Sequence, residues 1–232
     1  MCVLLAALCY ETAARANLAP GKTTCFSAIF MAWHPSASEI SGLYERHARA
    51  WDEERGKSLM ERAWLDRFKA AIPSGEAILD LGCGSGEPIA RYLIASGLHV
   101  TGVDSSSSLV ELCQERFPDE EWIVGDMREV RLDRRFGGIL AWDSFFHLTP
   151  DDQRRMFAVF DAHAGEGAAL MFTSGPRAGE AIGSYRGEAL YHASLDPTEY
   201  EALLKAHGFG VIAYVPDDPL CGGHTVWLTQ RR

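Results

Sequence analysis

Apolar residues along this 232-residue chain gather in short continuous runs, separated by stretches in which apolar positions recur every three to four residues. A short continuous run is typical of a strand covered on both faces, whereas the wider spacing is typical of an amphipathic helix. The runs that predict strands cover residues 78–81, 98–104, 121–124, 136–142, 167–173, 209–215 and 224–229.

Helices are predicted before and between most of these strands, over about 40–51, 58–70, 89–96 and 109–117 and from residues 150 and 197 onward. Two starts are sharply marked, because Thr149-Pro150 and Asp196-Pro197 each combine a capping side chain with a first-turn proline. Strand and helix alternate, so the predicted fold class is α/β: a doubly wound, mostly parallel sheet with helices on both faces.

Three glycines at alternate positions, Gly82, Gly84 and Gly86, follow the first strand, and Asp80 stands just before them. Glycine permits a tight turn and lets a ligand approach bare backbone. A strand, a glycine turn and a helix together aim N–H groups and the helix dipole at a ligand, as in α/β folds that hold nucleotide-like cofactors. The alternative is a turn that only requires small residues.

A second polar position follows the next strand, which ends at Asp104. A carboxylate at this tip is placed to accept hydrogen bonds from the two hydroxyls of a ribose. Alternatively, Asp104 caps the next helix, although the serines at 105–108 could do so unaided.

The motif Asp80-x-Gly82-x-Gly84-x-Gly86 resembles the first motif of the class I S-adenosylmethionine (SAM) methyltransferases, and Gly125-Asp126-Met127 is similar to the adenine-binding segment of that family. The resemblance covers about residues 43–232 and is strongest over 78–148. It implies a seven-stranded sheet with one antiparallel strand, a helical cap before the sheet, and SAM as cofactor. The cofactor-binding residues it implies are Tyr44, Asp80, Gly82, Cys83, Gly84, Gly86, Asp104, Ser105, Asp126, Met127 and Asp143. Core packing of Tyr44 and a simple turn at Gly125-Asp126 stay open as alternatives.

The fourth strand ends in Asp143-Ser144-Phe145-Phe146-His147. In an open α/β sheet, ligands bind outside the carboxyl ends of the strands where the strand order reverses. We therefore expect residues 143–147 to face the transferred methyl group. His147 is the candidate catalytic base, because its ordinary pKa is near neutrality; a histidine that only packs is the alternative.

The expected domain organisation is one methyltransferase-like domain over 31–232, with the helical cap at 31–73 and a lid-like insertion at 174–195 that shapes acceptor binding. Residues 1–30 are expected to be a poorly determined extension, produced by a mis-assigned start with synthesis beginning near Met31. An export signal is the alternative.

The composition of the chain limits the classes of binding partner that we expect. The chain has 22 basic and 32 acidic residues, a net charge of −10, which argues against nucleic acid or an anionic membrane. No apolar run approaches the roughly 20 residues of a membrane span. The six cysteines are scattered without metal-binding spacing, so we expect no metal, and free thiols in a reducing cytoplasm. The sequence does not indicate an oligomeric state.

These patterns predict a SAM-dependent methyltransferase that moves a methyl group to an O, N or C nucleophile, on a small-molecule acceptor. Two alternatives stay open: a non-catalytic SAM-binding protein, and an NAD(P)-dependent oxidoreductase, whose fingerprint spaces its glycines differently. The identity of the acceptor is not readable from the sequence.

Overall fold

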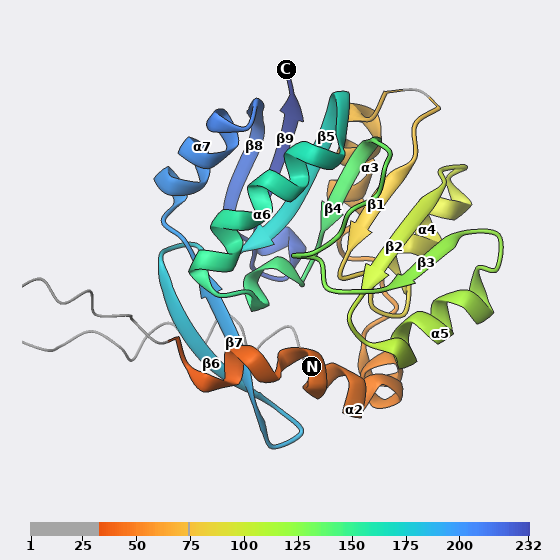
Figure 1. Cartoon of the computed structure of the whole chain (residues 1–232), viewed down its shortest axis with the longest axis vertical. Helices are drawn as coiled ribbons and strands as arrows, with labels where there is room; N and C mark the ends of the chain where they lie inside the picture. Colours follow the sequence, from red (N-terminus) through yellow and green to blue (C-terminus); the bar gives the residue numbers. More distant parts are fainter. Residues whose placement is uncertain (1–32, 74) are drawn as a thin grey trace, which may run out of the picture.

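A seven-stranded sheet lies at the centre of the protein (Figure 1). The structure is a computed structural model and describes residues 33–73 and 75–232. The strand order is β3-β2-β1-β4-β5-β9-β8, with β9 antiparallel to both neighbours and the other pairings parallel. The predicted fold class and the single antiparallel strand are thus confirmed, whereas the prediction for residues 1–30 lies outside the described residues. The strands are β1 (Ile78–Leu81), β2 (Val100–Asp104), β3 (Glu121–Val124), β4 (Phe136–Ala141), β5 (Ala164–Ser174), β8 (Phe209–Asp218) and β9 (His224–Arg231).

The two central strands, β1 and β4, are buried along their whole length, as their continuous apolar runs predict. Leu79 and Ile139 face one side of the sheet and pack in a cluster with Phe157. Ile78 and Leu140 face the other side and belong to a second cluster. Helices therefore cover both faces: α3 (Arg62–Ala71), α4 (Ile89–Ala95), α5 (Ser107–Arg116), α6 (Pro150–His163) and α7 (Pro197–Ala206).

The helix starts follow the predicted capping chemistry. Thr149 accepts a hydrogen bond from the Asp152 backbone and begins α6, and Asp196 accepts one from the Thr198 backbone and begins α7. Ser106 caps α5 by accepting from the backbone N–H of Leu109.

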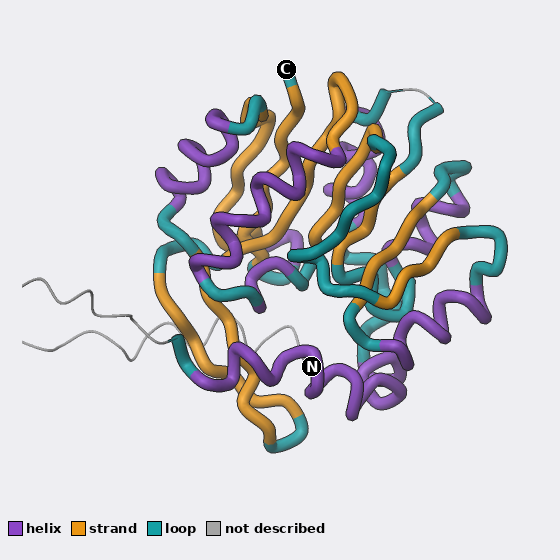
Figure 2. The backbone as a smooth tube through the Cα atoms, in the orientation of Figure 1, coloured by secondary structure: helices purple, strands orange, loops and turns teal. Residues whose placement is uncertain are grey.

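The strand order reverses between β1 and β4, and the carboxyl ends of the central strands meet at one edge of the sheet. Loops gather there (Figure 2), and the 3-10 helix η2 (Pro35–Glu39) and helix α2 (Ile40–Glu54) run across this edge (Figure 1). Of the residues expected to form a cap, those of η2 and α2 cover the edge. Helix α3 instead packs its apolar side, including Phe68, against a sheet face.

A two-stranded ribbon, β6 (Gly179–Tyr185) and β7 (Glu188–Ser194), fills most of the 174–195 segment. The sequence does not predict this hairpin, because its short runs of small and polar residues carry no continuous apolar signal. The ribbon lies beyond the main sheet, beside η2 and α2 (Figure 1).

Polar contacts hold α2 from both sides. Toward α5, Glu45 accepts hydrogen bonds from Ser106 Oγ at 2.6 Å and from the Ser108 backbone N–H at 3.1 Å. These bonds lower the pKa of Glu45 to about 2. Toward the ribbon, Glu188 accepts from His47 Nε2 at 2.6 Å and pairs with Arg46.

A third contact fastens α2 near its end. The buried Asp52 carboxylate accepts from Arg116 Nη1 at 2.7 Å and Nη2 at 2.6 Å, and from Ser85 Oγ at 2.6 Å. The Arg116 guanidinium holds the pKa of Asp52 well below its usual value. Helix α2, helix α5 and the glycine turn are therefore joined at one carboxylate.

We expect Asp52→Ala to lower the free energy of unfolding by about 2 kcal/mol at pH 7, since charge-assisted hydrogen bonds are lost. A depressed carboxyl pKa stabilises the fold above the ordinary value of 3.8, and that stability is lost as the pH falls through the folded-state pKa. The difference from wild type should therefore shrink between pH 4 and pH 2 in urea titrations. The exposed Asp119→Ala is the matched control; a penalty that stays constant down to pH 2 would contradict the ionic origin.

Candidate active site

A cavity of about 380 Å³ lies at the carboxyl edge of the sheet, between the loops that follow β1 to β4 and the inner side of η2 and α2. Residues from well-separated parts of the chain line it. The cavity brings together every residue that the sequence singled out: Tyr44, Asp80, Gly82, Cys83, Gly84, Gly86, Asp104, Ser105, Asp126, Met127, Asp143 and His147.

The glycine turn forms one wall. Gly82 has a φ of 81°, and a Cβ placed there would lie 2.2 Å from the Cβ of Ser144, so a side chain is excluded by both conformation and space. Ser144 in turn donates to the Leu81 carbonyl at 2.6 Å. Gly84 also has a positive φ, of 55°, but a Cβ there would meet no atom within 4 Å. Its backbone therefore faces open space.

Asp104 lies at the tip of β2, next to this turn. Its Oδ2 accepts from the Gly84 backbone N–H at 2.9 Å, and its Oδ1 accepts from the Ser106 backbone N–H at 2.9 Å. Burial raises the pKa of Asp104. Because Ser106 is the cap of α5, Asp104 is not needed for that role, and its remaining lone pairs are open to a ligand.

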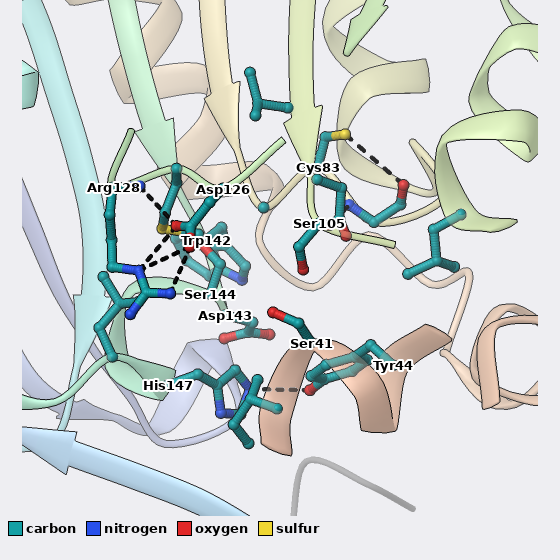
Figure 3. A pocket seen from close by; sticks show the side chains of 18 of the residues that line it. Ser41, Tyr44, Cys83, Ser105, Asp126, Arg128, Trp142, Asp143, Ser144 and His147 are labelled. Atoms are coloured by element: carbon teal, nitrogen blue, oxygen red, sulfur yellow. Dashed lines mark hydrogen bonds and ion pairs between the residues drawn. The ribbon is translucent and has the colours of Figure 1, made fainter. Parts of the chain in front are cut away.

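Asp126, after β3, is paired within the protein. Both of its carboxylate oxygens accept hydrogen bonds from Arg128 (Figure 3). Arg128 also donates to Asp152 at 3.0 Å. Burial acts against ionisation of Asp126, but the hydrogen bonds from Arg128 outweigh it and lower its pKa. The sequence did not predict this pair, which occupies part of the acceptor capacity expected to serve adenine.

The loop after β4 presents Asp143 and His147 to the cavity, opposite Tyr44 of α2 (Figure 3). His147 Nδ1 lies 2.7 Å from the Tyr191 carbonyl, which can only accept, so this nitrogen carries the proton. His147 Nε2 then accepts from the Tyr44 hydroxyl at 2.9 Å. Burial lowers the pKa of His147, and the ring is a neutral imidazole with its basic nitrogen toward the cavity.

Asp80, on β1, is buried at the bottom of the cavity. Burial, reinforced by the charge of Asp104, raises the pKa of Asp80 to about 7. A cation placed beside it would favour the ionised form.

Among the cavity residues that the sequence did not single out are Arg55 and Trp142. Arg55 follows α2 and donates to Glu61 Oε1 at 3.2 Å, and it lies 3.9 Å from Asp143 Oδ2. The indole nitrogen of Trp142 is buried, with no hydrogen-bond partner among the described residues. No motif spacing marks these positions, because their contacts depend on how distant segments pack.

Two kinds of feature are absent from residues 33–73 and 75–232. This part of the chain has no group of three or more histidine, cysteine or acidic side chains arranged to hold a metal. It also has no helix long and apolar enough to cross a membrane.

The strand order, the glycine turn after β1 and the acid at the tip of β2 define the class I methyltransferase fold. Residues 78–167 match the family model described as methyltransferase domain. This match agrees with the motifs of the sequence, which are similar to those of the class I methyltransferases.

Among related proteins, demethylmenaquinone methyltransferase of Thermotoga maritima is 36% identical over 102 residues, 42% of this chain and 43% of that protein. The putative methyltransferase YqeM of Bacillus subtilis is 31% identical over 135 residues, 55% of this chain and 54% of that protein. The chain thus matches about half the length of these relatives. The SAM-bound structure of CalS10, an amino pentose methyltransferase from Micromonospora echinaspora, shares the fold with a TM-score of 0.62 at 20% identity, over 82% of this chain and 97% of that one.

Proposed function

We propose that this protein is a SAM-dependent methyltransferase that transfers a methyl group to an O, N or C nucleophile of a small molecule. The observation that carries the proposal is the single cavity in which the glycine turn, Asp104 and the Asp143–His147 loop converge. A methyltransferase needs a cofactor-binding site and an acceptor site that lie side by side in one cavity, and the chain provides such a cavity.

The residues present fit SAM. Gly84 leaves bare backbone open to a ligand, and Asp104 has acceptor capacity suited to a ribose. Met127 and Asp126 would lie at the adenine end. Arg55 offers a guanidinium for a carboxylate, a pairing for which its planar fork is well shaped.

When bound, SAM supplies a methyl group on a sulfonium leaving group that is already activated. The chain therefore has mainly to position the acceptor and exclude water, and orientation alone can supply about 7–11 kcal/mol. Two acids of the cavity wall, Asp80 and Asp143, are placed to offset the positive charges of the cofactor.

His147 is the proposed general base. Its Nδ1–H is fixed by the Tyr191 carbonyl, so Nε2 is the basic nitrogen, and it accepts a hydrogen bond from the Tyr44 hydroxyl. An acceptor hydroxyl that displaces the Tyr44 hydroxyl would give its proton to this nitrogen. Before the acceptor binds, the hydrogen bond from Tyr44 keeps the imidazole ring of His147 in the orientation that proton transfer requires.

A small acceptor is favoured because η2 and α2 cover one side of the cavity, and the ribbon, the proposed lid, packs against both of them. Several relatives carry small-molecule names, such as 27-O-demethylrifamycin SV methyltransferase of Amycolatopsis mediterranei. A reducing cytoplasm is part of the same proposal, since Cys83, Cys113 and Cys221 are free thiols.

Calorimetric titration of the purified protein with SAM, S-adenosylhomocysteine and NADH tests the proposal. Binding of both sulfur ligands with no response to NADH is expected. Binding of NADH alone would move the protein to the oxidoreductases. Binding of SAM without release of S-adenosylhomocysteine from any acceptor in a broad panel would favour a non-catalytic binding protein.

A pair of glycine variants sharpens this test. Gly84→Ala and Gly97→Ala both place a Cβ at positive φ where nothing lies within 4 Å, so each should cost about 1–2 kcal/mol of stability. Only Gly84 lines the cavity, so only Gly84→Ala should also weaken SAM binding, by about tenfold or more. Equal affinities of the two variants would show that SAM does not approach the glycine turn.

A further inference from the structure

Asp143 has an unusual backbone conformation for a residue on the cavity wall. Its φ is 52°, in the left-handed region that non-glycine residues rarely adopt. Two contacts hold it there: its backbone N–H donates to Thr173 Oγ1 at 2.9 Å, and its Oδ1 meets His224 Nε2 at 2.8 Å. A strained conformation persists where surrounding contacts determine it, and such positions cluster at functional sites.

His224 begins β9 and does not line the cavity. Its Nδ1 lies 2.6 Å from the Cys221 carbonyl oxygen, which can only accept, so Nδ1 carries a proton. Its Nε2 faces the carboxylate of Asp143, which as an anion also only accepts, so Nε2 carries a second proton. The two partners together require an imidazolium.

The surroundings supply the matching charges. Buried Glu61 pairs with Arg55, Arg55 lies 3.9 Å from Asp143, and Asp143 pairs with His224. The four groups form a chain of alternating sign that is neutral only while His224 is protonated. Asp218, opposite His224 on β8, is engaged elsewhere and accepts from the indole N–H of Trp64 at 2.8 Å.

Two neighbours of this chain are neutral, and a third, Asp80, on which the charge of Arg55 acts, has a pKa that burial raises to about 7, below the pKa of His224. Burial raises the pKa of the Cys221 thiol to about 12, so that group is neutral. His147, on the other side of Asp143, has a lowered pKa and is neutral as well. The Asp143 carboxylate raises the pKa of His224 to about 9 in spite of burial, in agreement with the geometry.

We propose that His224 is a positioning residue that, as an imidazolium, holds the Asp143 carboxylate in the orientation that cofactor binding requires. This role rests on the proposed function, because it assigns Asp143 to the SAM site. Asp143 contacts the cavity directly, whereas His224 acts through it from behind the wall. The ring of Trp142, which lines the cavity, lies 5.5 Å from that of His224 between ring centres.

The protonation state is tested by NMR of the protein labelled with ¹⁵N-histidine, with His224→Gln used to assign the signals. Both His224 nitrogens should carry a proton at pH 7.5, and the ring should lose one of the two protons only near pH 9. In Asp143→Asn the midpoint should fall by about one pH unit or more. A neutral His224 at pH 7.5, or a midpoint that Asp143→Asn leaves in place, would overturn the proposal.

The positioning role is tested by calorimetric binding of S-adenosylhomocysteine from pH 6.5 to 9.5. His224→Gln should bind about tenfold more weakly than wild type at pH 7.5, and this gap should close above pH 9, where wild type also loses the charge. Titration of the ligand's own amino group affects both proteins alike and cancels in the comparison. A gap that does not change with pH would mark a merely structural role and overturn the proposal.

Two controls keep the outcomes separate. His207→Gln removes another histidine that faces a carboxylate, Asp161, away from the cavity, and it should leave binding unchanged. Thermal unfolding confirms that each variant is folded. If wild type binds neither SAM nor S-adenosylhomocysteine, the proposed function fails, whereas the NMR result on His224 stands by itself.

Discussion

Asp104→Ala is expected to weaken binding of SAM and of S-adenosylhomocysteine by at least about 100-fold. A hydrogen bond to a charged group contributes about 1.5–3 kcal/mol, and a carboxylate facing two ribose hydroxyls makes two of them. The substitution also frees the Gly84 backbone N–H, which donates to Asp104 at 2.9 Å, and so loosens the glycine turn. Calorimetry at constant salt measures the effect, with either ligand.

Two variants control this result. Asp104→Asn keeps one acceptor oxygen and should fall between wild type and Asp104→Ala. Asp119→Ala removes an exposed acid outside the cavity and should bind normally. Wild-type affinity in Asp104→Ala would exclude the ribose role and leave Asp104 as a support for the turn.

His147→Ala is expected to lower turnover by about 10²–10⁴-fold on a hydroxyl acceptor, the usual contribution of a positioned base. Affinity for SAM should change little, because His147 is assigned to the acceptor. In wild type the rate should fall as the pH drops through the lowered pKa of His147, since only the neutral ring accepts a proton. Release of S-adenosylhomocysteine with phenols, alcohols and amines measures the effect.

The matched control is His207→Ala, outside the cavity, which should keep the wild-type rate. Full activity of His147→Ala would show that the acceptor needs no base, as with a carboxylate or a free amine. The Tyr44→Phe variant separates the two partners of the hydrogen bond, because it leaves Nε2 of His147 free and should keep a substantial part of the rate.

The central sheet and the cofactor wall could be predicted from the sequence because their signals are local. Ile78 to Leu81 is continuously apolar since both faces of β1 are covered, and Gly82 is glycine since the turn leaves no room for a Cβ. The caps at Thr149 and Asp196 act within their own first turn. Each of these features is contained in a few consecutive residues.

The rest depends on pairs that are distant in sequence. His224 and Asp143 are 81 residues apart and Tyr44 and His147 are 103 apart, so no spacing rule joins them. The β6–β7 ribbon has a mixed pattern because it packs against α2 and η2 instead of the main sheet. The pairing of Asp126 with Arg128 is local, but a surface ion pair and a cofactor contact use the same residue types.

The two sides of the cavity come from different stretches of the chain. The glycine turn, Asp104 and Asp126 belong to the stretch that matches the methyltransferase domain, whereas η2 and α2 lie before it, and the ribbon that packs against them lies after it. Under the proposed function, related proteins can differ in η2, α2 and the ribbon and so accept different substrates. The residues that bind the cofactor, in the glycine turn and at Asp104 and Asp126, stay the same. The polar contacts that fasten α2 to α5 and to β7 would then limit exchange of α2 between such proteins, because a foreign α2 would have to supply counterparts of Glu45, which binds α5, and of Arg46 and His47, which bind Glu188 of β7.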